Sequence, residues 1–180
     1  MKKIVYAAIS SFVFMFCAQA NAALITDSSN QTSDGQLFNF SLNGPVSDGA
    51  SGILTVTSRG DYSIGPFPGS ESWDINIEGL FLQNDVVPTD GNIITEFSFD
   101  DVFWEIDFVL SGSLLSQVSA DGVFNISIDL DSGVNNFNPL TASVAVALEY
   151  HTQSVPEPAS IVLLGLGLVG IGFLRKKKAA

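Results

Sequence analysis

Apolar and polar residues alternate with a period of two in short runs between Leu24 and Tyr150, and this alternation limits the fold of the 180-residue chain more than any other feature. Successive side chains of a β-strand point to opposite faces, so a period of two predicts strands with one buried and one solvated face. No stretch between these two residues keeps a helical period. The clearest runs cover residues 38–42, 73–77, 104–110, 124–130 and 140–150.

Turn-forming residues separate these runs. Glycine supplies positive φ, proline fixes its own φ, and Asp or Asn bonds to the local backbone. Such clusters occur at 43–45, 48–49, 65–69, 88–92, 111–113, 121–122 and 131–133. The spacing predicts an all-β fold, an antiparallel β-sandwich or jelly roll of eight or nine strands, over residues 23–150.

Cysteine and charge indicate how this domain is stabilised and which partners it avoids. The sole cysteine, Cys17, precedes the predicted domain, which must therefore rely on an apolar core. All carboxylates except Glu157 lie in residues 23–154, where Arg59 is the only Lys or Arg. This negative field repels nucleic acid and anionic lipid, and it attracts divalent cations. The simplest role of this negative charge is to keep an extracellular domain soluble.

The first 22 residues have the three parts of a secretory signal peptide. Lys2 and Lys3 are followed by an apolar stretch over residues 4–17 and then by small residues. Ala20 and Ala22 supply the small side chains that signal peptidase requires, so we expect cleavage between Ala22 and Ala23. The apolar stretch is too short for a comfortable membrane span.

Several acidic residues are candidates for a calcium site. Hard cations prefer several oxygen ligands, which loops between strands can bring together. The chain lacks the twelve-residue EF-hand pattern, so calcium remains a candidate cofactor resting on charge density alone. The candidate ligands are Asp100, Asp101, Glu105, Asp107, Asp129 and Asp131.

Four aromatic residues are candidates for a platform that binds sugar rings: Tyr62, Trp73, Trp104 and Tyr150. Trp73 and Trp104 are in register with apolar strand positions, which favours core packing. Tyr62 falls in a predicted turn and is therefore the aromatic residue expected to be exposed to a ligand. The preceding tripeptide 59–61, Arg-Gly-Asp, is interpreted as part of the same turn, with Arg59 paired to Asp61 or Asp74.

The sequence gives little support for catalysis. His151 is the only histidine and the predicted mature domain has no cysteine, so neither an acyl-transfer set nor a zinc set is formed. A glycoside hydrolase that uses two carboxylates remains an alternative, because such enzymes need only a suitably spaced pair. The abundance of carboxylates makes any one pair uninformative.

The C-terminal 26 residues form a distinct tripartite segment. The first part is a linker, residues 151–158, which ends in Val155, Pro156, Glu157 and Pro158. The second part, residues 159–174, is apolar. The third part is the basic tail 175–180, which begins with Arg175, Lys176, Lys177 and Lys178. The prolines fix their own φ and lack N–H donors, which keeps this segment extended up to the start of the apolar run. The apolar run predicts a transmembrane helix of about 24 Å, shorter than the ~30 Å hydrocarbon core. The basic residues would stay cytoplasmic, which places the β domain outside.

This segment strongly resembles the PEP-CTERM sorting signal of Gram-negative bacteria that make exopolysaccharide. The resemblance covers residues 155–178, and Pro156, Glu157 and Pro158 occupy the motif positions. It implies recognition by an exosortase, a polytopic inner-membrane protease, and delivery to the cell surface or extracellular matrix. An ordinary single-pass anchor is the alternative. Residues 54–61 and 72–79 also loosely resemble the jelly-roll ectodomains that accompany this signal.

We therefore expect a secreted, non-enzymatic surface or matrix protein, held transiently in the inner membrane by its tail and processed by an exosortase. Signal peptidase and exosortase are its expected partners, with exopolysaccharide as a further candidate and nucleic acid excluded. The alternatives from other classes are a calcium-dependent carbohydrate-binding module and, behind it, a glycoside hydrolase.

Overall fold

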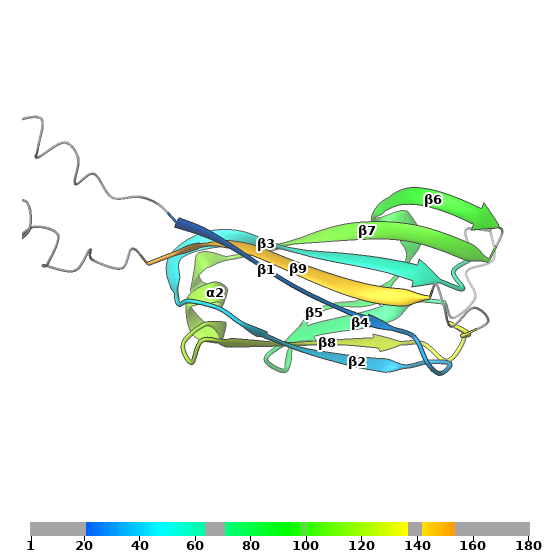
Figure 1. The fold of residues 1–180 in the computed structure, drawn as a ribbon, viewed down its shortest axis with the longest axis horizontal. Coiled ribbons are helices and arrows are strands. Elements are labelled where there is room, and N and C mark those ends of the chain that lie inside the picture. The colour runs from blue at the N-terminus through cyan, green and yellow to red at the C-terminus, as the bar shows by residue number, and fades with distance from the viewer. Residues whose placement is uncertain (1–20, 64–70, 99, 137–141, 154–180) are drawn as a thin grey trace, which may run out of the picture.

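The chain forms two antiparallel sheets that pack face to face, as the computed structural model in Figure 1 shows. The structure describes residues 21–63, 71–98, 100–136 and 142–153. Within them lie the strands β1 (Asn21–Asn30), β2 (Leu37–Asn43), β3 (Ser47–Gly60), β4 (Trp73–Ile77), β5 (Leu80–Val86), β6 (Asn92–Ser98), β7 (Asp101–Leu110), β8 (Val123–Leu130) and β9 (Ser143–Thr152). A 3₁₀ turn η1 (Pro88–Asp90) and one short helix α2 (Gly112–Val118) complete the described elements.

Strand pairing is nested from the ends of the domain inward. β1 pairs with β9, β2 with β8, β3 with β7, and β4 with β5. The resulting sheet orders are β1-β9-β3-β7-β6 and β2-β8-β4-β5. This is the arrangement of a jelly roll, a double-sheet fold of eight strands, with β6 added as an edge strand. Nested pairing places Asn21, the first described residue, beside Thr152, the last residue of β9.

The core fills the space between the sheets with the apolar residues of the alternating runs. Phe38, Phe40 and Leu42 of β2 are buried while the residues between them are exposed, and β4, β8 and β9 repeat the pattern. Each fully buried large apolar side chain contributes about 1.5–3 kcal/mol relative to exposure. The alternation in the sequence therefore predicted both the strands and the faces that they bury.

The two ends of the sandwich differ. We call the end that holds Asn21, Thr152 and α2 the proximal end, and the opposite end, which holds Gly60 and Leu130, the distal end (Figure 1). At the proximal end α2 packs on β3 so closely that a Cβ on Gly112 would lie 1.7 Å from the carbonyl oxygen of Gly49. Only glycine fits this position, which closes that end of the core.

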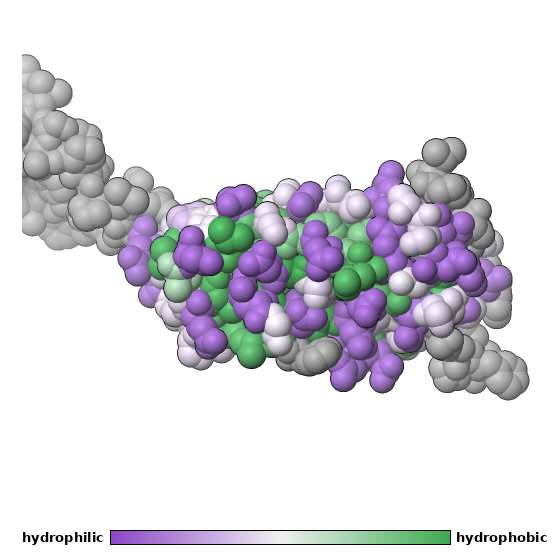
Figure 2. Space-filling model, turned by 90° about the horizontal axis from the view of Figure 1, so that it is seen from below, coloured by the Kyte–Doolittle hydropathy of each residue, from purple (hydrophilic) through white to green (hydrophobic). Residues whose placement is uncertain are grey.

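The outer face of the four-stranded sheet is a mosaic of polar and apolar side chains, seen from below in Figure 2. Asn39, Ser41 and Asn125 lie among its exposed residues, and Ser41 Oγ bonds to the Asn125 amide oxygen at 2.8 Å. Polar pairs of this kind stabilise the solvated face of a sheet.

The structure departs from two sequence expectations. Residues 111–113, expected to be a turn, begin helix α2, because Ser111 accepts a hydrogen bond from the Leu114 N–H at 3.3 Å and caps it. Strand β9 extends to Thr152, two residues past the predicted domain boundary, because Thr152 pairs with Asn21 and Ser47.

The predicted targeting segments fall largely outside the described residues. These are the signal peptide up to residue 20 and the tail 154–180, with the predicted membrane helix and basic cluster. Among the described residues, no helix has the length and apolarity needed to cross a membrane.

Candidate functional site

Both chain ends of the folded domain meet at the proximal end. Asn21 lies opposite Thr152, Ala22 opposite His151, and Ala23 opposite Tyr150 in the β1–β9 ladder. The predicted signal cleavage site thus lies on β1, directly beside the C-terminal end of the last strand, β9. A chain cut after Ala22 keeps β1 from Ala23 onward.

The last described residues are fixed to the connection between β2 and β3. The Gln153 N–H donates to the Val46 carbonyl at 3.2 Å, and Tyr150 Oη donates to the Pro45 carbonyl at 2.6 Å. Burial raises the pKa of Tyr150, so its hydroxyl remains a donor at neutral pH. The chain therefore leaves the sandwich from a defined position.

The predicted motif begins almost at once after the fold. Pro156 is four residues beyond Thr152, which at about 3.3–3.6 Å per residue limits their separation to roughly 14 Å. Val155, Pro156, Glu157 and Pro158 themselves lie outside the described residues, as do Ala20 and the basic cluster 175–178. Any enzyme that binds the motif must approach the proximal end of the sandwich.

Fold and chain ends together define a β-sandwich domain with a C-terminal sorting segment attached directly to its last strand. Residues 154–177 match the family model of the PEP-CTERM protein-sorting motif, which confirms the sorting signal that the sequence resembles at this end of the chain. The motif is a substrate signal for an exosortase and implies secretion by this sorting route. Comparison with curated proteins found no match, and neither did comparison with solved structures.

At the distal end, the domain's single basic side chain is part of a structural ion pair. Arg59 Nε and Nη2 donate to the two carboxylate oxygens of Asp101 at 3.0 and 2.8 Å, and this hydrogen bonding raises the pKa of Arg59. The guanidinium also lies 3.7 Å from the ring centroid of Phe97. The expected partners Asp61 and Asp74 were wrong, because Asp101 begins the strand that pairs with β3 beside Arg59.

The tripeptide 59–61 does not form the turn that the sequence predicted. Arg59 and Gly60 belong to strand β3, and Asp61 is buried. Its carboxylate accepts from the side chain and backbone of Asn135, at 2.8 and 3.3 Å. Desolvation raises the pKa of Asp61, with smaller upward contributions from Glu71 and Asp100, while the bonds from Asn135 oppose the shift.

The predicted calcium ligands are not brought together. Asp107 lies on the outer face of the five-stranded sheet and accepts from Thr55 at 2.6 Å, whereas Asp129 belongs to the other sheet. Asp101 is paired with Arg59, and Asp131 accepts a short bond from Ser72. No group of three or more metal-ligating side chains occurs in the part of the chain that the structure describes.

The prediction that Tyr62 is exposed was wrong. Tyr62 is 1% exposed, its hydroxyl bonds to Ser58 at 2.7 Å, and burial raises its pKa. Its ring meets Trp104 edge-on at 5.6 Å, and Trp104 stacks on Trp73 at 5.4 Å. The even-numbered residues of β3 are buried from residue 52 onward, and this pattern continues past the strand to residue 62. The period of two therefore predicts a buried Tyr62, whereas the neighbouring turn-forming residues suggested an exposed one.

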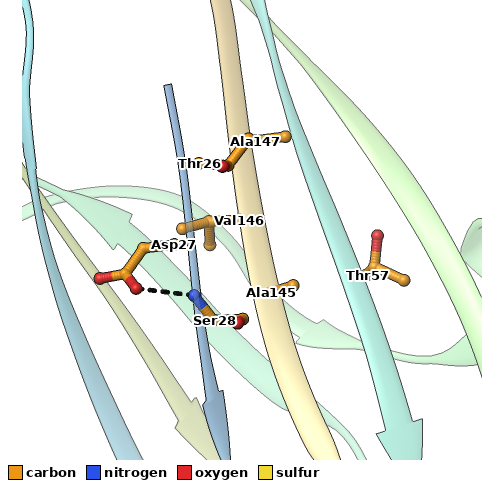
Figure 3. Close-up of a pocket in the computed structure, with 7 residues that line it drawn as sticks. All are labelled: Thr26, Asp27, Ser28, Thr57, Ala145, Val146 and Ala147. Carbon is orange, nitrogen blue, oxygen red and sulfur yellow. Dashed lines mark hydrogen bonds between the residues drawn. The ribbon is translucent and has the colours of Figure 1, made fainter. Parts of the chain in front are cut away.

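Sequence reasoning missed a shallow groove on the outer face of the five-stranded sheet. Figure 3 shows its lining, with Ala145 and Ala147 of β9 between Thr26 and Ser28 of β1 and Thr57 of β3. Its volume is about 430 Å³. The small side chains follow from cross-strand register, which pairs Thr26 with Ala147 and Ser28 with Ala145. Only strand pairing reveals this grouping, because the residues come from three distant segments.

Proposed function

We propose that this protein is a non-enzymatic surface or extracellular-matrix protein of an exopolysaccharide-producing cell. Signal peptidase removes residues 1–22, residues 159–174 hold the chain in the inner membrane, and an exosortase processes the tail. The observation that carries the proposal is the sorting motif at residues 154–177, which starts two residues after the last strand.

The position of the chain ends supports this order of events. Both predicted processing sites are at the proximal end, since Ala23 pairs with Tyr150 and the motif follows Gln153. The rest of the sandwich extends away from that end for about 33 Å, the length of a ten-residue strand at ~3.3 Å per residue. The sorting motif thus stays outside the folded sandwich, whereas the signal cleavage site lies in the β1–β9 ladder and is cut before β1 pairs with β9.

The carboxylates that a hydrolase would require support a structural role instead. Asp101 neutralises Arg59, Asp107 accepts from Thr55, and Asp61 accepts from Asn135. Each of these carboxylates already stabilises a contact between elements distant in sequence. We therefore favour a domain that is delivered and displayed over one that carries out a reaction.

Contact with polysaccharide is the second candidate function, and the groove of Figure 3 is the observation that favours it. Hydroxyls of Thr26, Ser28 and Thr57 can exchange hydrogen bonds with sugar hydroxyls, and the alanines leave room for a chain to lie across β9. This contact uses no calcium, in contrast to the module considered from the sequence.

The sorting proposal is tested by deleting the exosortase in the cell that makes this protein. We expect the protein to keep a larger mass and to stay in the inner membrane, while the parent strain releases or displays a shorter form. Replacing Glu157 with alanine (Glu157→Ala) should reproduce the deletion, and Glu96→Ala, at an exposed position of edge strand β6, is the matched control in the folded domain. Unchanged size and location in both cases would refute the proposal.

The polysaccharide contact is tested by sedimentation of the purified protein with the cell's own exopolysaccharide. Thr57→Arg should fill the groove and abolish co-sedimentation, whereas Ser127→Arg on the outer face of the other sheet should leave it unchanged. Equal binding by both variants would exclude the groove.

A further inference from the structure

Three exposed apolar side chains form one row across the outer face of the five-stranded sheet. Register places Leu24, Glu149, Ile53 and Val109 side by side on β1, β9, β3 and β7. Leu24 is 65% exposed, Ile53 42% and Val109 76%. We call these three residues the apolar row. Exposed apolar side chains that gather in this way mark contact surfaces more often than scattered ones do.

The apolar row lies at the proximal end. Two residues further toward that end in the same ladder, Ala22 pairs with His151, and Thr152 is the last residue of β9. The row is thus about 10 Å, three residues of strand, from Thr152, where β9 ends. The same end of the sandwich therefore holds the chain ends and an exposed apolar strip.

The length of the connection keeps this end close to the bilayer before processing. Six residues, 153–158, separate Thr152 from the predicted membrane helix at Ala159. Fully extended, this connection spans at most roughly 25 Å. The headgroup layer alone accounts for about 5–7 Å of that distance. A domain held so closely meets the surface at a high effective concentration, so a weak contact suffices.

The uneven distribution of carboxylates also favours an orientation with the proximal end nearer the membrane. The proximal end carries Asp48, Glu78, Asp121 and Glu149. The distal end is far more acidic, with Asp34, Asp61, Glu71, Asp74, Asp85, Glu96, Asp100, Asp101, Asp129 and Asp131. Anionic lipid therefore repels the distal end more strongly than the proximal end. At 0.1 M salt the Debye length is roughly 10 Å, so only carboxylates close to the membrane contribute to this repulsion.

We propose that the apolar row is a membrane-contact surface, which seats the tethered sandwich on the phospholipid headgroup layer through the proximal part of the outer face of its five-stranded sheet. The inference rests on the proposed function, because the membrane-held tail supplies the tether. Glu149 lies between Leu24 and Ile53, so the carboxylate limits the contact to the headgroup depth. The seated domain presents Pro156 to Pro158 to a processing enzyme at a constant height above the membrane.

The test measures which end of the sandwich approaches lipid. The full chain, with Cys17→Ser, receives a single labelled cysteine at Val109→Cys or, as control, at Leu37→Cys, a distal position that is 51% exposed. Each is reconstituted in vesicles of phosphatidylethanolamine and phosphatidylglycerol that contain a headgroup nitroxide lipid. We expect at least twofold stronger quenching of the label at residue 109. Equal quenching in protein that floats with the vesicles would overturn the membrane contact and leave the sorting proposal intact.

A second set of variants tests whether the apolar row contacts lipid or binds a protein such as the processing enzyme. With the label at His151→Cys, the combination Leu24→Ser and Ile53→Thr should reduce quenching, whereas Leu37→Ser and Phe97→Ser should not. If the row variants slow exosortase processing in cells but leave quenching unchanged, the row binds the enzyme and the lipid proposal is wrong. If the full chain fails to float with vesicles, both the tether and this inference fall.

Discussion

Ala23 lies directly opposite Tyr150 in the ladder between the first and last strands, so the predicted start of the mature chain and the end of the fold are neighbours. This relationship follows from nested strand pairing, which brings the ends of the domain together. The sorting motif that follows Gln153 therefore shares one end of the molecule with the signal cleavage site. Changes at this end should affect processing and stability together.

Tyr150→Phe should loosen the proximal end. It removes the 2.6 Å bond to the Pro45 carbonyl while keeping the ring packed against Phe124 at 5.1 Å. We expect a loss of about 1 kcal/mol in the free energy of unfolding, because phenylalanine cannot replace this part-buried hydrogen bond. Urea denaturation followed by circular dichroism measures it. An unchanged midpoint would mean that the bond contributes nothing.

Gly112→Ala should be strongly destabilising, because the new Cβ would collide with the backbone of Gly49 rather than with a flexible side chain. Overpacking of this kind costs about 1–3 kcal/mol or more. Gly60→Ala is the matched control, since its Cβ would make ordinary contacts at 3.4 Å and beyond. Thermal unfolding compares the two variants, and similar midpoints would contradict the close packing of α2 on β3.

Arg59→Met should destabilise the distal end by about 1–3 kcal/mol, since it leaves the carboxylate of Asp101 without its charged partner. Asp101→Asn combined with Arg59→Met should recover part of the loss. Chemical denaturation of the two single variants and the double variant gives the coupling between the residues. A coupling of zero would show that the ion pair has no role in folding.

Asp61→Asn should make stability less dependent on pH. The pKa of Asp61 is higher in the folded chain, so the folded state binds the proton more tightly than the unfolded state does. Its contribution to stability is present at low pH and is lost as the pH rises through the folded pKa. Asparagine keeps an oxygen acceptor for Asn135 and does not titrate. Melting temperatures of variant and wild type should therefore diverge in favour of the variant as the pH rises from about 4 to 7; a constant difference would contradict this.

The fold was largely predictable from the sequence, because alternation fixes which side of each strand is buried. Phe124, Ile126 and Ile128 are buried as their spacing predicted, and so is Trp104. The helix α2 was missed, since its seven residues are too few to establish a helical period. Its Ser111 cap and the buried pair Leu115 and Val118 were the available signals.

The candidate site was predictable only in its linear part. The sorting motif is contiguous, so its resemblance to a known sorting signal could be recognised within residues 155–178 alone. The partner of Arg59, the burial of Tyr62 and the separation of Asp107 from Asp129 all depend on which strands pair. Register between strands distant in sequence is set by the whole hydrophobic pattern, which no local motif contains.

The most direct test of the central claim is the intact mass of the protein recovered from the cell surface or medium, which fixes its C-terminus. Processing at the sorting motif predicts a chain that ends within or close to residues 154–158 and lacks the apolar and basic segments, in cells that have the exosortase and not in cells without it. A surface form that still ends at Ala180 in both would contradict the account.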